Sequence, residues 1–151
     1  MLAFVKKIFD LWLEDDNPAF RIRNFRNVIR TMCGGKPIDC SSNVGGCKRF
    51  IAITANGDVY PCHRFVGRRD FVIGNLLEKS LPDIYADAAD LYEKLCELDE
   101  NCVHCEWLTA CGSGCAFERL VANGTFKSMD PECQVKKGLF AYITEKTKHL
   151  F

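Results

Sequence analysis

Four cysteines fall within fourteen residues in the second half of the chain. They follow the spacing C-x2-C-x5-C-x3-C and are Cys102, Cys105, Cys111 and Cys115. Thiols at this density invite oxidation and fill little core volume, so such a run usually exists to bind metal. Thiolates are soft ligands, which select zinc, copper(I) or iron–sulfur clusters over hard cations. The run therefore predicts a metal site.

The chain contains ten cysteines, so the run does not account for all of them. We expect further ligands before and after it, which are Cys40, Cys47, Cys62 and Cys133. Eight thiols in total are enough for two sites with four ligands each. Cys33 and Cys96 fall outside the spacing pattern, and we expect both to be small buried apolar residues.

Three kinds of site are compatible with these spacings. A disulfide framework fits the even count, but Lys6 and Lys7 interrupt the apolar N-terminal run that a secretion signal would need. One zinc ion would leave half of the thiols unused, whereas two zinc ions would use all eight. Two iron–sulfur clusters would also use eight thiolates, and the backbone at Gly112–Gly114 would let N–H groups approach the cluster sulfides.

Length, composition and charge narrow the class of protein. The 151 residues suit one ordinary domain, with 48% hydrophobic and 26% charged residues. A formal net charge of +0 argues against binding to nucleic acid or to an anionic lipid surface. No segment is long and apolar enough to span a bilayer. We therefore expect a cytoplasmic protein, in which thiols stay reduced.

The elements that must position these thiols can be read from the apolar periodicity. Residues 2–15 and 25–32 predict helices, and residues 19–24 alternate weakly like a short strand. Residues 50–62 predict a β-hairpin with a type I′ turn at Asn56-Gly57, which would bring Cys47 near Cys62. Residues 71–76 predict a further extended segment.

Two helices are predicted in the remaining chain. Ser80 and Pro82 predict the start of a helix whose apolar stripe runs to Leu98. A last helix spans about 131–148 and has Cys133 in its first turn, where the helix dipole favours a thiolate. The predicted fold is α+β: a small hairpin-centred domain with flanking helices and two metal clusters. Residues 1–35 would form linker or packing helices, and residues 36–151 the cluster domain.

The cysteine spacings and the sequence segments around them resemble those of a known family. Cys47-x9-Gly57-x4-Cys62, the run at 102–115 and Cys133 together resemble the seven-cysteine pattern of a SPASM domain. SPASM domains are C-terminal auxiliary iron–sulfur domains of radical S-adenosylmethionine (SAM) enzymes that mature peptides and proteins. Cys40 resembles the additional ligand of the sulfatase-maturase branch. The segments Asn56-Gly-Asp-Val-Tyr-Pro-Cys62 and Cys111-Gly-Ser-Gly-Cys115 agree with the resemblance.

The resemblance implies how the ligands are shared. Its first [4Fe–4S] cluster would be held by Cys40, Cys47, Cys62 and Cys115. Its second would be held by Cys102, Cys105, Cys111 and Cys133. Four thiolates on each cluster leave no iron open to substrate, so the implied role is electron transfer and positioning of a precursor peptide.

Two departures from the family pattern qualify this reading. The radical-generating C-x3-C-x2-C motif is absent, so this chain is not expected to be catalytic alone. SAM would bind only through a radical SAM barrel domain, in the same full-length chain or in a partner. His63 replaces the aspartate that follows the third ligand in sulfatase maturases, which favours maturases of peptide natural products. The rival hypothesis is a zinc-stabilised binding module without a redox role.

Overall fold

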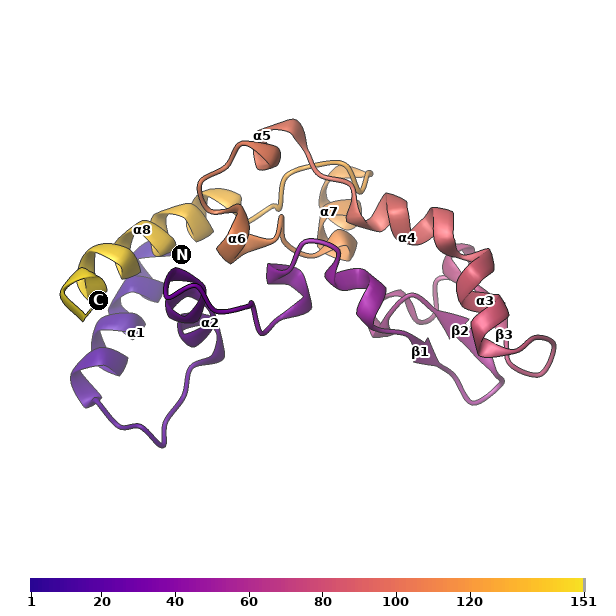
Figure 1. Cartoon of the computed structure of the whole chain (residues 1–151), viewed down its shortest axis with the longest axis horizontal. Coiled ribbons are helices and arrows are strands. Elements are labelled where there is room, and N and C mark those ends of the chain that lie inside the picture. Colours follow the sequence, from indigo (N-terminus) through magenta and orange to yellow (C-terminus); the bar gives the residue numbers. More distant parts are fainter. Residues whose placement is uncertain (151) are drawn as a thin grey trace.

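The computed structural model describes residues 1–150, which form an arch with helices at one end and a small sheet at the other (Figure 1). The helical end contains α1 (Leu2–Asp15), α2 (Arg23–Met32) and α8 (Cys133–Thr147), which is followed by a 3-10 turn at Lys148–Leu150. The sheet end contains β1 (Ala52–Ile53), β2 (Asp58–Tyr60), β3 (Gly74–Asn75), α3 (Leu81–Asp87) and α4 (Ala89–Cys96). Helices α5 (Glu100–Val103), α6 (Leu108–Cys111) and α7 (Ala116–Asn123) lie between the two ends. The α+β prediction is thus confirmed in its coarse form, as a helix-rich fold with one small antiparallel sheet.

The helical end is held together by an apolar core. Phe9 of α1 and Ile143 of α8 are fully buried, and Phe25 of α2 meets the Phe9 ring edge-on with 5.2 Å between centroids. The predicted helix at 2–15 is confirmed in full. The strand predicted at 19–24 is wrong, because Asn17 turns the chain by accepting a hydrogen bond from the Ala19 N–H.

The hairpin forms where it was predicted, but its turn differs from type I′. Ile53 pairs with Val59, and the Thr54 N–H donates to the Asp58 carbonyl, which leaves a loop of residues 55–57. Only Gly57 of this loop has a positive φ, at 87°. A three-residue loop needs a single left-handed residue at its end, so one glycine suffices. β3 then pairs with β2, which gives the strand order β1-β2-β3.

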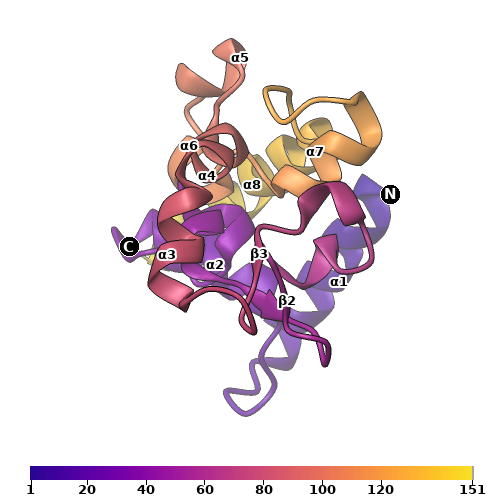
Figure 2. The ribbon, with the colours of Figure 1, turned by 90° about the vertical axis from the view of Figure 1, so that its right-hand side faces the viewer.

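The helix predicted from Ser80 to Leu98 is divided in two. Ser80 caps α3 as expected by accepting a hydrogen bond from the Asp83 N–H at 3.4 Å. The backbone leaves the helical region at Ala88, where φ is −88° and ψ is 6°. The break lets Ala88, Tyr92 and Leu95 pack into one apolar cluster with Tyr60 and Phe65 next to the strands. Figure 2 shows α3 and α4 beside the strands when the sheet end faces the viewer.

The core of the helical end crosses the predicted domain boundary after residue 35. It joins Phe9 and Phe25 from the first segment to Leu139 and Phe140 of α8. The division into residues 1–35 and 36–151 stays a prediction. Within residues 1–150, no helix has both the length and the apolar character needed to cross a membrane.

Candidate metal centres

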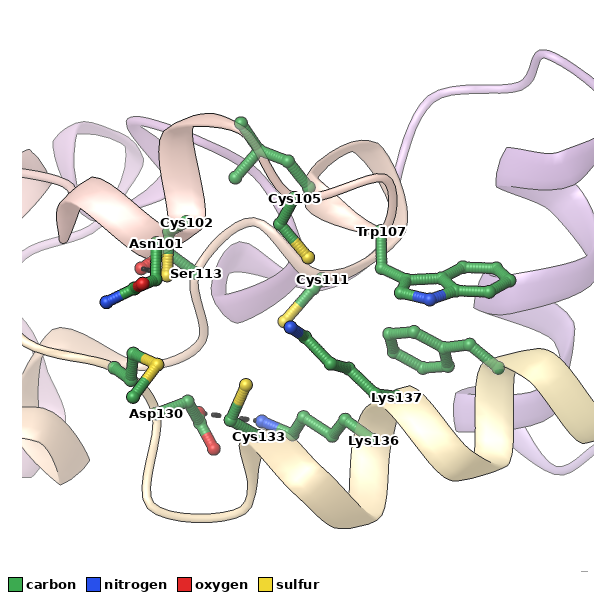
Figure 3. A pocket seen from close by; sticks show the side chains of 13 residues that line it. Asn101, Cys102, Cys105, Trp107, Cys111, Ser113, Asp130, Cys133, Lys136 and Lys137 are labelled. Atoms are coloured by element: carbon green, nitrogen blue, oxygen red, sulfur yellow. Dashed lines mark hydrogen bonds and ion pairs between the residues drawn. The ribbon is translucent and has the colours of Figure 1, made fainter.

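Four of the predicted ligands line a single pocket between α5, α6 and α8. Cys102 lies in α5, Cys105 in the loop after it, Cys111 ends α6 and Cys133 begins α8. Figure 3 shows their thiols turned toward the same space, which is partly open to solvent. Residues up to 31 positions apart in sequence thus come together, as the predicted second group requires.

The wall of this pocket is apolar on one side and charged on the other. The Trp107 ring packs against Phe140, with 5.8 Å between centroids, and both residues line the pocket. Asp130 is only 6% exposed and accepts a hydrogen bond from the Lys136 ammonium at 2.7 Å. Lys137 also lines the pocket, and its side chain reaches toward Cys111 in Figure 3.

The backbone at Gly112–Gly114 lies very close to residues from other segments of the chain. All three residues have left-handed φ angles, of 60°, 70° and 78°. A Cβ on Gly114 would lie 1.8 Å from a carboxylate oxygen of Asp130, so only glycine fits there. The buried Ser113 hydroxyl donates to the Cys102 sulfur at 3.6 Å. A hydroxyl donor aimed at a thiolate stabilises its charge.

The other four predicted ligands converge next to the sheet. Cys40 begins one 3-10 turn (Cys40–Ser42), and Cys47 lies in a second (Gly46–Arg49). Cys62 directly precedes the 3-10 turn at His63–Phe65, and Cys115 precedes α7. Another 3-10 turn lies at Arg69–Phe71.

Two glycines bring the turns of this first group together. A Cβ on Gly46 would lie 2.2 Å from the Cys40 carbonyl oxygen, so the absence of a side chain lets the two turns stack. A Cβ on Gly112 would lie 2.3 Å from the Asn43 backbone nitrogen. Gly112 therefore also joins the cysteine run to the turn that carries Cys40.

The thiols of the first group are electrostatic neighbours. Burial, followed by the nearby Cys96, Cys115, Cys62 and Cys40 thiols, raises the pKa of Cys47 to about 12. Burial also raises the pKa of Cys62, while backbone N–H groups of Arg64 and Phe65 oppose this effect. In the second group, burial raises the pKa of Cys111 and of Cys133. Neighbouring thiolates without a cation repel each other in a low-dielectric setting, and a bound metal would remove that penalty.

The thiols surround a space and do not meet at a point. Within residues 1–150, no three His, Cys, Asp or Glu side chains are arranged to hold a single metal ion. The donor set itself fits iron–sulfur clusters, since each group offers four thiols on separate elements and the Ser113 hydroxyl donates to one of the sulfurs, that of Cys102.

Other candidate residues have more ordinary surroundings. His63 and His104 are exposed at the surface. Cys33 is exposed, so the prediction of a buried apolar residue is wrong there. Cys96 is half-buried and lies next to Cys47, which the sequence spacing did not indicate. The sequence analysis did not single out Arg119, a charged residue whose exposed fraction in the structure is only 2%.

The comparisons with known proteins agree on one family. Residues 45–112 match the family model described as the SPASM iron–sulfur cluster-binding domain. The cysteine-type anaerobic sulfatase-maturating enzyme of Clostridium novyi is 31% identical over 117 residues, covering 75% of this chain and 31% of the relative. The PqqA peptide cyclase of Xanthomonas axonopodis pv. citri is 30% identical over 101 residues, covering 66% of this chain and 27% of the relative. The chain spans about a third of the length of these curated relatives.

Solved structures contain a region with the same fold as this chain. His-tagged anSMEcpe with bound AdoMet superposes with a TM-score of 0.81 at 25% sequence identity. The match covers 99% of this chain and 40% of that chain. Native anSMEcpe with bound AdoMet and the Cp18Cys peptide has the same fold, with a TM-score of 0.77. Residues 45–112 of this chain therefore belong to the SPASM family of iron–sulfur cluster-binding domains.

Proposed function

We propose that this chain is the auxiliary-cluster domain of a radical SAM enzyme that modifies a ribosomally made peptide. The observation that carries the proposal is the pocket between α5, α6 and α8, which is lined by Cys102, Cys105, Cys111 and Cys133. The thiols that raise the pKa of Cys47 include those of Cys40, Cys62 and Cys115, which supports a second group. The fold shared with anSMEcpe supports the same interpretation.

The first [4Fe–4S] cluster would be held by Cys40, Cys47, Cys62 and Cys115. The second would be held by Cys102, Cys105, Cys111 and Cys133. Bound clusters of this kind supply one-electron redox chemistry. This chain's own residues anchor them with four thiolates each, exclude water with Trp107, and offer cations from Lys136 and Lys137 at the second site.

Four thiolates per cluster leave no iron available for a substrate atom. The proposed role is therefore electron transfer and positioning of the peptide, while bond breaking takes place on a radical SAM barrel domain. That barrel would be part of the same full-length chain or of a partner. The natural reading frame or its neighbour should accordingly encode a C-x3-C-x2-C motif.

The iron–sulfur and zinc hypotheses predict different metal contents. Zinc holds four thiolates about 2.3 Å from one centre, whereas each iron of a cubane takes one thiolate, so the ligands stand apart. The lining of a pocket by four thiols supports the second arrangement. Anaerobic reconstitution of the chain should give about eight irons and eight acid-labile sulfides per chain. Two zinc ions per chain without acid-labile sulfide would contradict the proposal.

A further inference from the structure

Arg119 is a buried charged residue whose guanidinium joins separate segments of the chain. It lies on α7 and is only 2% exposed. At the end of α4, it donates hydrogen bonds to the carbonyls of Leu95 at 3.0 Å and Glu97 at 2.7 Å. A further hydrogen bond goes to the carbonyl of Phe126, in the loop after α7. Hydrogen bonds from a charged donor in a buried setting are strong, so Arg119 fixes both segments relative to α7.

The helix that carries Arg119 begins next to a proposed ligand of the first cluster. Cys115 is the N-cap of α7, and its carbonyl accepts a hydrogen bond from the Arg119 N–H at 3.0 Å. Arg119 therefore lies one helical turn after Cys115. Ala116, the next residue, is 1% exposed and belongs to the same buried cluster as Leu95 of α4. The position of Cys115 thus depends on how α7 packs on α4.

The end of α4 connects Arg119 to a second proposed ligand. α4 packs on the 3-10 turn that contains Cys47, and Lys48 of this turn forms an ion pair with Glu93 of α4. Cys47 itself packs against the buried cluster that includes Leu95. The hydrogen bonds from Arg119 to the end of α4 therefore also bear on the position of Cys47.

Phe126 connects Arg119 to a third proposed ligand. The Phe126 ring packs against that of Phe65, with 6.4 Å between centroids. Phe65 is 1% exposed and belongs to the 3-10 turn that directly follows Cys62. Arg119 thus joins three segments that each lead to a different ligand of the first group. The lining of the pocket that holds the second group includes none of its carbonyl partners.

We propose that Arg119 is a positioning residue for the first cluster, because it holds the segments of Cys47, Cys62 and Cys115 in place relative to one another. This inference rests on the proposed function. The thiolates of one cluster come from separate elements, and residues behind the ligands orient them. Release of α4 from α7 would therefore withdraw ligands from the first cluster and leave those of the second in place.

The test compares Arg119→Gln with the unaltered chain after anaerobic reconstitution. Glutamine has no charge and one short amide group, so it cannot reach all three carbonyls. The iron content should fall from about eight toward about four per chain. The remaining EPR signal of the reduced protein should match that of Cys115→Ala, in which only the second cluster is expected to stay intact.

Two further variants complete the comparison. Arg119→Lys keeps the charge and a donor group, so it should retain more of the first cluster's signal than Arg119→Gln. Arg21→Gln is the matched control, because Arg21 also donates to a carbonyl, that of Pro18 at 3.2 Å, but is exposed at the helical end. It should bind as much iron as the unaltered chain.

The outcomes separate this inference from the proposed function. Iron content and EPR signals of Arg119→Gln equal to those of the control would overturn the inference. Equal loss of both clusters would also overturn it, because Arg119 would then support the chain as a whole. If circular dichroism shows that Arg119→Gln does not fold, Arg119→Lys takes its place, with a weakened first-cluster signal expected and equal change in both signals counting against the inference. If the unaltered chain takes up no iron and sulfide, the proposed function fails and this inference falls with it.

Discussion

Charged side chains next to the second group of cysteines distinguish it from the first. Lys136 and Lys137 line its pocket and are neighbours of Cys111 and Cys133, and Lys136 also pairs with the buried Asp130. The neighbours that raise the pKa of Cys47 after burial are, by contrast, other thiols. A positive charge beside an anionic cluster favours its reduction.

Lys137→Met should therefore shift the reduction potential of the second cluster to a more negative value. Methionine keeps the apolar length of the side chain but removes the charge. A spectroscopic redox titration of the reconstituted chain measures the shift, and Lys137→Arg should restore most of the original potential. Lys79→Met, at the exposed sheet end, is the control. A Lys137→Met potential equal to that of the control would refute this prediction.

Gly114→Ala should destabilise the chain by about 2–4 kcal/mol, because it adds left-handed backbone strain and a collision with buried Asp130. Gly124→Ala is the matched control, since Gly124 has a φ of 73° with open space around its Cα. It should cost only about 1 kcal/mol, from strain alone. Chemical denaturation of both variants measures the difference. Equal losses would mean that the close packing of Gly114 on Asp130 does not matter.

Sequence reasoning at the residue scale went furthest where one residue type has one dominant use. The cysteine spacings predicted eight ligands, and the SPASM resemblance divided them into two groups of four. Cys102, Cys105, Cys111 and Cys133 line one pocket, and the ligand assignment stays a prediction. Asp130 and Cys96 were not predictable, because neither lies in a motif. Their proximity to the proposed ligands depends on how α4 and the segment before α8 pack, which periodicity does not specify.

At the scale of elements, the helices were predicted better than the turns between them. α1 follows a strong apolar stripe, so its bounds were predictable from periodicity. The break at Ala88 was not, because it serves packing of Tyr92 and Leu95 against the sheet-end core. The hairpin was predictable from Gly57, but its loop length is set by the pairing of Thr54 with Asp58.

Arg119 connects three elements near the first group of cysteines. From α7 its buried guanidinium donates to the carbonyls of Leu95 at 3.0 Å and Glu97 at 2.7 Å, and to that of Phe126. The end of α4 and the loop after α7 are thereby tied together. Its Nε atom is buried without a partner.

Arg119→Met should lower the free energy of unfolding by about 3–5 kcal/mol, since three carbonyls lose a charged donor in a buried setting. Arg64→Met is the control, because it removes an exposed ion pair with Glu118, which lies on α7 like Arg119. This variant should lower the free energy of unfolding by less than about 1 kcal/mol. Urea denaturation of both variants provides the comparison. Similar losses in the two variants would contradict the proposed connecting role.

At the scale of the whole molecule, the two proposed sites lie between a helical end with its own core and a sheet end with another. The thiols come from short turns and helices at the edges of these two cores: Cys111 packs against the first, and Cys47 and Cys62 pack against the second. Metal ligation would therefore supply much of the stability of this middle part.

Removal of the clusters by chelation should loosen the middle of the arch more than its ends. Hydrogen exchange should become faster at residues 40–47 and 102–115, while α1 and α8 stay protected because their core contains Phe9 and Ile143. Mass spectrometry of the chain with and without clusters measures this. Equal changes along the whole chain would contradict a local stabilising role.

The central claim is that the cysteine run is shared, with three ligands for the second cluster and one for the first. Cys115→Ala tests this claim most directly, with Cys111→Ala as its counterpart. After anaerobic reconstitution, EPR of the reduced protein should show that Cys115→Ala perturbs the first cluster and leaves the second unchanged. Cys111→Ala should do the reverse. Perturbation of the same cluster by both variants would contradict the shared arrangement.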